Sequence, residues 1–310
     1  IEDFTNKNNI PKFVFIVPYR DRLPQLICYI NQMKYILEDL EDTFQIFICH
    51  QADNRPFNRG AMKNLGFIYV KNKYSNNYKD IVLVFQDIDT LPSYKNMFNF
   101  DVERNNIKHF YGFKQTLGGL FSLKAETYES LNGFPNFWEW GYEDNCLYKR
   151  CYMKNIVVDR GMFYPIDSDK FLQLSHGLDN RTREVNIKSK NRFINDLGSD
   201  GIITLENINY TLNNTLDIPY MKEIKIIDFT NWIIPENHKT IKTVVYNKEY
   251  VHGKSNVLNK PTLNSIKAKK REQDIKQQKK YKELSKPKGL RFNNNRRMLF
   301  NYNTFGNLYR

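Results

Sequence analysis

Three apolar runs in the first 90 residues alternate with segments whose apolar positions recur at helical spacing. The runs are FVFIV (13–17), FQIFICHQ (44–51) and DIVLVFQDID (80–89), and the segments between them are LPQLICYINQMKYILEDL (23–40) and the second half of NRPFNRGAMKNLGFIYV (54–70). Continuous apolar strands are typical of a sheet that is buried on both faces, and alternation of strands with helices favours parallel pairing. The pattern therefore predicts an α/β domain with a mainly parallel sheet flanked by helices.

The pattern changes twice more along the chain. After residue 90 the sequence becomes irregular and aromatic, and FINDLGSDGIITL (193–205) lies near the end of this part. Two strand-like pieces follow, EIKIIDF (223–229) and IKTVVYN (241–247), and then a Lys-, Gln- and Asn-rich segment in which SIKAKKREQDIKQQKKYKEL is the one plausible helix. We predict a main domain over residues 1–212, an accessory β-rich element over 213–253, and a basic, partly helical or disordered tail over 254–310.

Charge is concentrated in that tail. The chain has a net charge of +13, and residues 254–310 hold 16 Lys and Arg against 3 acidic residues, which leaves the first 253 residues neutral. A basic tail can contact an anionic surface such as nucleic acid, a membrane or an acidic glycan, or it can be a solvated extension. The neutral body argues against an enzyme that acts on nucleic acid. No apolar run approaches the roughly 20 residues that a transmembrane helix needs.

A pair of carboxylates follows the third predicted strand. Asp87 and Asp89 lie two residues apart, so strand alternation would point both side chains to one face. The carboxyl end of a strand in an α/β sheet is the usual ligand crevice, and paired carboxylates there suit Mg²⁺ or Mn²⁺. The alternative is turn chemistry, because Asp before TLP is also typical of a turn.

Three arginines are predicted at the same edge of the sheet. Arg20 and Arg22 follow the first strand in VPYRDR, and Arg59 precedes a helix in FNRGAMKNLGF. Guanidinium groups suit phosphates and nucleobase edges, although a surface salt bridge is the simpler explanation for each arginine when it is taken singly. His176, in LQLSHG, is a candidate metal ligand if the edge holds a metal, and a structural histidine otherwise.

The stretch FWEWGYEDN (137–145) places two tryptophans and a glycine beside Glu143 and Asp144. Aromatic walls around a carboxylate exclude water and offer flat faces to sugar rings. The alternative is structural, with the tryptophans in the core and the two acids at the start of a helix through NCLYKRCYM.

These motifs together resemble the β-1,4-galactosyltransferases. FVFIVPYRDR, FNRGAMKNLGF, FQDIDTLP, LGGLFSLKAETYESLNGFPNFWEWGYEDN and SHG occur in the order and spacing of that family, and the block over residues 118–144 is the most specific part. The resemblance implies a GT-A-type fold. It also implies an inverting, Mn²⁺-dependent transfer of a hexose from a UDP-sugar to an acceptor hydroxyl, with residues 1–212 as the catalytic domain.

The resemblance further implies a role for each matching residue. Asp144 would be the general base at the transfer site, and Glu143 would orient the site. Metal binding is implied for Asp89, His176 and Gln173, with Mn²⁺ as the expected ion and Mg²⁺ as the alternative. Binding of the nucleotide sugar is implied for Pro18, Tyr19, Arg20, Arg22, Phe57, Arg59, Asp87, Trp140 and Gly141.

Several positions depart from the pattern of that family. Asn145 replaces an aspartate that contacts the acceptor sugar. Thr116 stands where the galactose enzymes carry a tyrosine, so the pocket that it forms with Gly118 and Gly119 has room for an N-acetyl group. Gln173 replaces a methionine and is a harder metal ligand, which favours Mg²⁺ as well. The segment NRTREVNIKSKNRF lacks the Arg-Phe arrangement of the family's acceptor site.

We therefore predict a metal-dependent inverting glycosyltransferase that moves galactose or N-acetylgalactosamine from a UDP-sugar to a glycan or glycoconjugate. An inactive glycan-binding or scaffolding relative is the alternative, and the presence of Asp89, His176 and Asp144 counts against it. A nucleic-acid-binding protein is a third class, which the neutral body disfavours. The Asn-, Lys- and Ile-rich composition is typical of AT-rich coding. With no anchor visible, we expect a cytoplasmic location, for example a viral factory, rather than the Golgi lumen.

Overall fold

The computed structural model describes residues 10–138, 141–174 and 187–233. The chain divides into two units, residues 1–244 and 245–310, and every described residue lies in the first. The predicted strand IKTVVYN, the predicted tail helix and the whole basic tail lie outside the described residues. Along the described ranges, no helix is long and apolar enough to cross a membrane.

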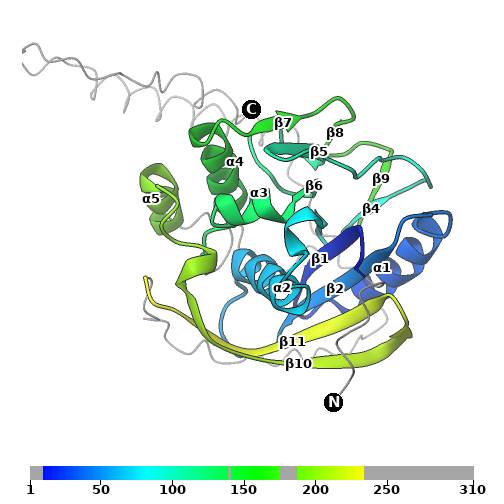
Figure 1. The fold of residues 1–310 in the computed structure, drawn as a ribbon, viewed down its shortest axis with the longest axis horizontal. Helices are drawn as coiled ribbons and strands as arrows, with labels where there is room; N and C mark the ends of the chain where they lie inside the picture. The colour runs from blue at the N-terminus through cyan, green and yellow to red at the C-terminus, as the bar shows by residue number, and fades with distance from the viewer. Residues whose placement is uncertain (1–9, 139–140, 175–186, 234–310) are drawn as a thin grey trace, which may run out of the picture. The chain divides into compact units, whose positions relative to one another are not determined.

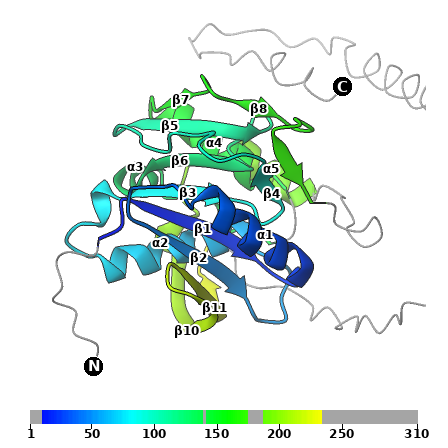
Figure 2. The same cartoon turned by 90° about the vertical axis from the view of Figure 1, so that its right-hand side faces the viewer.

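A nine-stranded mixed sheet forms the centre of the first unit (Figure 2). The strand order is β10 (Leu205–Ile218), β11 (Met221–Asn231), β2 (Phe44–Gln51), β1 (Phe13–Tyr19), β3 (Val82–Gln86), β6 (Leu120–Lys124), β5 (Asn106–Gly112) and β7 (Val157–Asp159), and β8 (Tyr164–Pro165) pairs with β5. Most neighbours are parallel, including β1 with β2 and with β3. The antiparallel pairs are β3 with β6, β5 with β6, and β10 with β11. A separate two-stranded sheet pairs β4 (Thr90–Pro92) with β9 (Phe171–Gln173).

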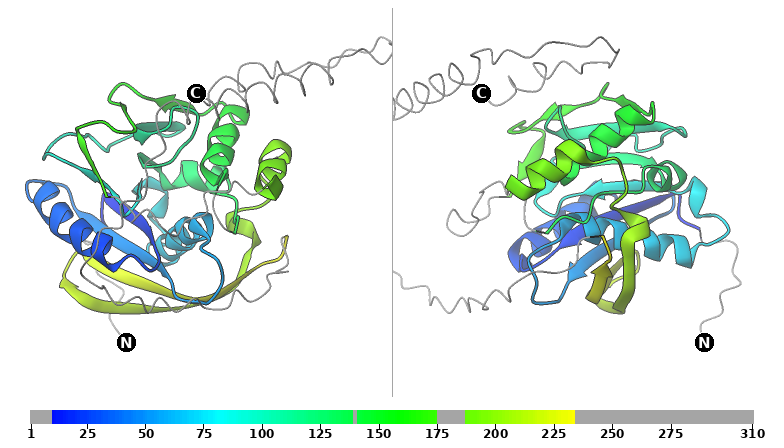
Figure 3. Two further views of the ribbon diagram at one scale, coloured as in Figure 1. Left: turned by 180° about the vertical axis from the view of Figure 1, so that it is seen from behind. Right: turned by 90° about the vertical axis from the view of Figure 1, so that its left-hand side faces the viewer.

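Helices cover both faces of this sheet (Figures 1 and 3). On one face, α1 (Leu23–Ile36) packs through Tyr29 with Phe15 of β1. On the other face, Val14 of β1 packs with the helices α2 (Arg59–Lys73), α3 (Ala125–Ser130) and α4 (Glu143–Met153). Phe15 and Val14 are both fully buried, as strand alternation requires when a sheet lies between two helical layers. A fifth helix, α5 (Ile187–Asn195), lies beside α4, where Lys149 Nζ donates to the carbonyl of Phe193 at 3.1 Å. The predicted α/β class, with a mainly parallel sheet flanked by helices, is confirmed.

The sheet extends beyond the three strands that the apolar runs predict. β5 and β6 add to one side, and β11 pairs in parallel with β2 on the other, from Met221 opposite Ile46 to Ile226 opposite Gln51. The boundary predicted after residue 212 falls inside β10, so the segment EIKIIDF shares a sheet with β1 to β3. The first helix also ends earlier than predicted, at Ile36.

Candidate active site

Helix starts and strand ends bring the predicted charged residues together. Arg59 is the first residue of α2, and Asn58 caps this helix by accepting a hydrogen bond from the Ala61 amide at 2.9 Å. Glu143 and Asp144 form the first turn of α4, where carboxylates interact favourably with the helix dipole. The structural expectation that the two acids begin a helix is therefore confirmed. These helix starts face the segment that follows β3.

Arg59 binds three carboxylates at once. Its Nε and Nη2 donate to Asp87 Oδ1 at 3.0 and 2.8 Å, and Nη2 also reaches Asp87 Oδ2 at 2.7 Å. Its Nη1 donates to Glu143 Oε1 at 2.7 Å and to the two Asp144 carboxylate oxygens at 2.8 and 2.9 Å. All of these side chains are largely buried, so Arg59 does not form the surface salt bridge that was the alternative.

Lys63 is a further member of this cluster that sequence reasoning missed. It lies one turn after Arg59 on α2, and its side chain is fully buried. Its Nζ is 3.5 Å from Asp87 Oδ1 and 3.8 Å from Asp144 Oδ1. The available signal was its spacing, because residues four apart on a helix share a face and Arg59 was already a candidate.

The two aspartates of the cluster respond oppositely to this environment. Burial alone would raise the pKa of Asp87, but the charges of Arg59 and Lys63 outweigh it and hold that pKa well below its usual range. Burial raises the pKa of Asp144, and the charges of Glu143 and Asp87 add to this effect, while Arg59 and Lys63 oppose it. A carboxylate with a raised pKa beside a permanently ionised one is a common arrangement for acid–base chemistry. Asp144 is the better candidate for exchanging a proton.

Two glycines bring a loop against these carboxylates. A Cβ atom at Gly118 would lie only 2.3 Å from Asp144 Oδ2, so no larger residue fits while that carboxylate keeps its position. Gly119 has a φ of +72°, a left-handed conformation that favours glycine, and its carbonyl accepts a hydrogen bond from the Asp87 amide at 3.0 Å. The Leu117 amide donates to the Asp144 carbonyl at 3.1 Å. The segment 117–119 therefore fixes the backbone of both aspartates.

Thr116 and Asn145 are the two residues that the sequence assigns to the sugar pockets. Thr116 directly precedes the segment 117–119, and Asn145 directly follows Asp144. Thr116 is buried, and its Oγ1 donates to the Phe113 carbonyl at 3.2 Å. Asn145 Nδ2 donates to the Gln115 carbonyl at 3.3 Å. Both residues adjoin the carboxylate cluster through their chain neighbours.

Asp89 belongs to a second ion pair. Arg22 Nη1 donates to Asp89 Oδ2 at 2.9 Å, and the charges of Asp87 and Arg59 also act on Arg22. Strand alternation does not apply to Asp87 and Asp89, because β3 ends at Gln86 and both aspartates lie in the turn before β4, which confirms the alternative of a turn. The Thr90 amide closes this turn by donating to the Asp87 carbonyl at 3.1 Å. Each aspartate therefore meets its own arginine.

The residues proposed for the metal are only partly described. Gln173 lies opposite Thr90 in the β4–β9 ladder, and the next residue, Leu174, donates its amide to the Asp89 carbonyl at 2.9 Å. The carboxylate of Asp89 and the amide oxygen of Gln173 are hard oxygen donors of the kind that Mn²⁺ and Mg²⁺ prefer, so the described part of the set fits such an ion. His176 lies outside the described residues, and within those residues no three His, Cys, Asp or Glu side chains cluster as ligands.

The other residues implied in nucleotide binding flank the cluster. Pro18 is buried at the end of β1, and the Tyr19 ring lies edge-on to His50 with ring centroids 4.7 Å apart. Arg20 donates to the Arg55 carbonyl and pairs with Asp53 at 3.3 Å, so Arg22 rather than Arg20 contacts Asp89. Phe57 packs against the core on the α2 side of the sheet.

The structure describes one of the two tryptophans of FWEWGYEDN. Trp138 is 2% exposed and stacks on Phe229 with ring centroids 5.4 Å apart, which confirms it as a core residue. Trp140 lies outside the described residues. Gly141 has a φ of +123°, and no atom of the described residues lies within 4 Å of where its Cβ would be. Tyr142 precedes α4 in a left-handed conformation with a φ of 69°. The chain thus turns sharply just before the two acids.

The fold and the ordered motifs match the class of GT-A-type glycosyltransferases. Two family models match consecutive parts of the chain: the N-terminal region of glycosyl transferase group 7 over residues 6–100, and the N-terminal domain of galactosyltransferase over residues 99–176. Together they cover more than half of the 310 residues. The chain belongs to glycosyl transferase group 7, the family of the β-1,4-galactosyltransferases.

Individual relatives agree with this assignment. The chain is 28% identical to β-1,4-galactosyltransferase 5 of Mus musculus over 67% of its own length and 54% of the relative, and 29% identical to β-1,4-galactosyltransferase 7 of Homo sapiens over 45% and 43%. It thus spans about half the length of the curated relatives it matches. A solved structure of a Drosophila β-1,4-galactosyltransferase 7 mutant, in complex with manganese, UDP-Gal and xylobiose, matches with 20% identity and a TM-score of 0.58 over 70% of this chain and 94% of that one. This likeness confirms the GT-A-like fold.

The comparisons correct one prediction. A cytoplasmic location was expected from the composition and from the lack of a visible anchor. The relatives are Golgi-type galactosyltransferases, which favours the Golgi lumen, so the cytoplasmic prediction is wrong.

Proposed function

We propose that the protein is a metal-dependent inverting glycosyltransferase that moves galactose or N-acetylgalactosamine from a UDP-sugar to a hydroxyl of an acceptor sugar. Membership of the family supports the reaction class, and the Drosophila relative is described with manganese, UDP-Gal and xylobiose bound. The observation that carries the proposal is Asp144, a carboxylate with a raised pKa that Arg59 holds against the Gly118 loop.

Each charged group of the site has a part in this proposal. Inversion requires one direct displacement at the anomeric carbon, so a base must take the proton of the attacking acceptor hydroxyl. Asp144 is that base, and Glu143 orients the site through the shared guanidinium of Arg59. Arg22 and Arg20 lie on the segment after β1, where guanidinium groups suit the diphosphate of the donor. No second carboxylic acid is required, in contrast to the inverting glycosidases.

The donor set for a metal fits this scheme. Asp89 and Gln173, with His176 as the third candidate, would hold Mn²⁺, and the oxygen donors would accept Mg²⁺ as well. When bound, the ion would stabilise the negative charge of the diphosphate leaving group. Arg22 already pairs with Asp89 at 2.9 Å, so its guanidinium would also be close enough to stabilise the negative charge of the diphosphate.

The choice of donor sugar concerns Thr116. This buried threonine is smaller than the tyrosine that the family resemblance implies at this position, and we expect the pocket with Gly118 and Gly119 to accept an N-acetylated sugar. The acceptor is proposed only as a glycan hydroxyl, with GlcNAc and xylose-ended acceptors as the first to test.

The proposal is tested by a UDP-release screen with purified protein. UDP-Gal, UDP-GalNAc, UDP-Glc and UDP-GlcNAc are each incubated with several acceptor sugars, with Mn²⁺ and with EDTA. We expect acceptor-dependent release from UDP-Gal or UDP-GalNAc that stops in EDTA and returns with added Mn²⁺. Release that EDTA leaves unchanged would contradict a metal-dependent reaction.

A further inference from the structure

A lysine ammonium is buried among the site carboxylates without a hydrogen bond. The side chain of Lys63 is fully buried, and its Nζ has no hydrogen-bond partner in the described parts of the chain. Its nearest carboxylate oxygens belong to Asp87 at 3.5 Å and Asp144 at 3.8 Å. The ring of Phe134 lies 4.6 Å away and that of Phe121 lies 6.0 Å away. The ammonium therefore lies between two phenylalanine rings and the carboxylates of Asp87 and Asp144.

Burial of such a group is costly. Removing an ammonium from water is unfavourable unless nearby charges compensate, and an apolar residue of the same length would pack well against Phe134 and Phe121. The face of Phe134 attracts a cation, but apolar packing alone does not require a charge at Lys63. The charge acts on the carboxylates that face it.

The balance of charges shows what Lys63 adds. The groups that face it are Arg59 from its own helix, Asp87 from the segment after β3, and Glu143 and Asp144 from α4. All three carboxylates bind the guanidinium of Arg59, and the charge of Arg22 also acts on Asp87. Without Lys63, Arg59 would be the cation that remains beside Asp144, and Asp144, whose pKa burial already raises, would take up a proton more readily.

We propose that Lys63 is a positioning residue for sugar transfer, whose buried ammonium keeps Asp144 ionised and ready to accept the proton of the acceptor hydroxyl. This inference rests on the proposed function. Its direction follows from the charges, because burial already raises the pKa of Asp144 and Lys63 opposes that rise. Loss of the ammonium therefore raises the pKa of Asp144 further, and a protonated Asp144 cannot act as a base.

The test is the pH profile of kcat for Lys63→Met at saturating UDP-sugar, acceptor and Mn²⁺. An opposite charge within about 4–6 Å moves a carboxyl pKa by about one to three pH units, so we expect the acidic limb of the profile to move up by about one pH unit or more. At pH values above the acidic limbs of both enzymes, the kcat of Lys63→Met should approach that of the wild type.

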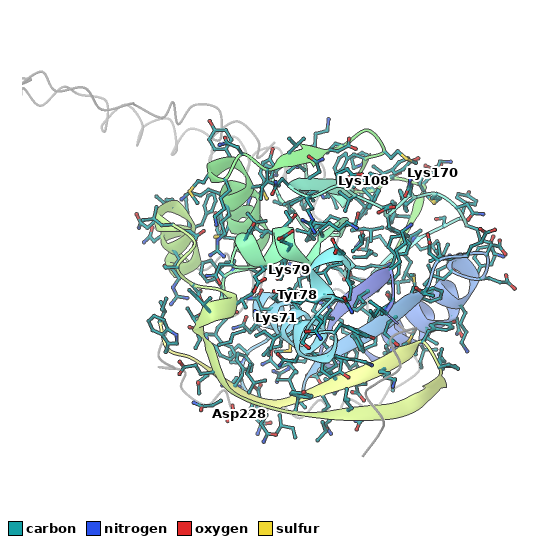
Figure 4. All side chains as sticks on the ribbon, viewed as in Figure 1. Lys71, Tyr78, Lys79, Lys108, Lys170 and Asp228 are labelled. Atoms are coloured by element: carbon teal, nitrogen blue, oxygen red, sulfur yellow. The ribbon has the colours of Figure 1, made fainter. Side chains whose placement is uncertain are left out.

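Lys71→Met is the matched control, because it removes the same charge from the same helix. Lys71 is partly exposed and pairs with Glu129 at 2.6 Å, and Glu129 also accepts a hydrogen bond from Tyr78. Figure 4 labels Lys71 and Tyr78 close together beside α2. The control should keep the wild-type profile.

Each result decides the matter. A Lys63→Met enzyme whose kcat falls equally at every pH, with its acidic limb in place, would reduce Lys63 to a packing role and overturn the inference. If Lys63→Met does not fold, Lys63→Gln, which keeps a polar end without the charge, takes its place. Selective ¹³C labelling of the lysine Cε in the wild type measures the protonation state of Lys63 by NMR, without a substitution. A Lys63 that is neutral across the active pH range would overturn the inference. A wild type without EDTA-sensitive transfer would instead defeat the proposed function.

Discussion

Gly118→Ala tests whether the position of the Asp144 carboxylate controls activity. A Cβ atom at residue 118 would lie 2.3 Å from Asp144 Oδ2 and 2.9 Å from its Cγ, whereas ordinary van der Waals contact begins near 3.4 Å. The carboxylate must therefore move by roughly 1 Å, which breaks the 2.9 Å contact of Oδ2 with Arg59. A displacement of about 1 Å at a catalytic group costs about 100-fold in rate, equal to about 2.7 kcal/mol of transition-state stabilisation.

The assay is kcat/KM for metal-dependent UDP release, measured beside thermal unfolding. Overpacking of this kind lowers the free energy of unfolding by about 1–3 kcal/mol, so a folded variant is expected. Gly161→Ala is the control, because among the described residues its Cβ would meet Asp159 Oδ1 at 3.2 Å, and this exposed carboxylate needs to shift by only a few tenths of an ångström while it accepts the Gly161 amide hydrogen bond. A folded Gly118→Ala enzyme that keeps kcat/KM within about threefold of the wild type would refute the reasoning.

Two further predictions concern stability. Arg59→Met removes the guanidinium that three largely buried carboxylates share, and we expect the free energy of unfolding in urea to fall by about 3–5 kcal/mol. A loss below about 1 kcal/mol would contradict the role of Arg59 in holding these carboxylates. Burial and the charge of Arg160 lower the pKa of His109 to about 4, so the unfolded chain binds more protons below pH 6.5. Its contribution is complete above pH 6.5 and falls by about 3 kcal/mol as the pH drops to about 4. The urea midpoint of His109→Gln should not fall in this way between about pH 6.5 and about pH 4. An equal change of the urea midpoint with pH in the wild type and the variant would disprove the role of His109.

The central part of the fold could be predicted from periodicity alone. FVFIV, FQIFICHQ and IVLVF are continuous apolar runs, and they form β1, β2 and β3. β5 and β6 were not predicted as strands, because buried polar residues interrupt their apolar runs. His109 is 1% exposed, and its Nε2 lies 3.0 and 3.1 Å from the carbonyls of Tyr111 and Gly118, contacts that no local pattern announces. Burial of a polar side chain depends on such distant partners.

The site could be predicted in part. The motif order identified Arg59, Glu143 and Asp144, and the structure brings these three into one cluster. Lys63 escaped, because a lysine on a helix ordinarily faces solvent and its burial depends on acids that other elements supply. The sequence left open whether Asp87 and Asp89 continue the strand or form a turn, because it does not locate the last residue of a strand to within a residue or two. The roles of Trp140 and His176 stay predictions, since both lie outside the described residues.

The account stands most directly on Asp144 as the base of a metal-dependent transfer. The decisive measurement is kcat of Asp144→Asn at saturating Mn²⁺, donor and acceptor, together with its affinity for UDP by calorimetry. The substitution keeps the size of the side chain and removes its ability to accept a proton, and general base catalysis contributes about 100- to 10,000-fold. We predict a fall in kcat of at least about 100-fold with UDP affinity close to that of the wild type. A kcat within about tenfold of the wild type would contradict the account.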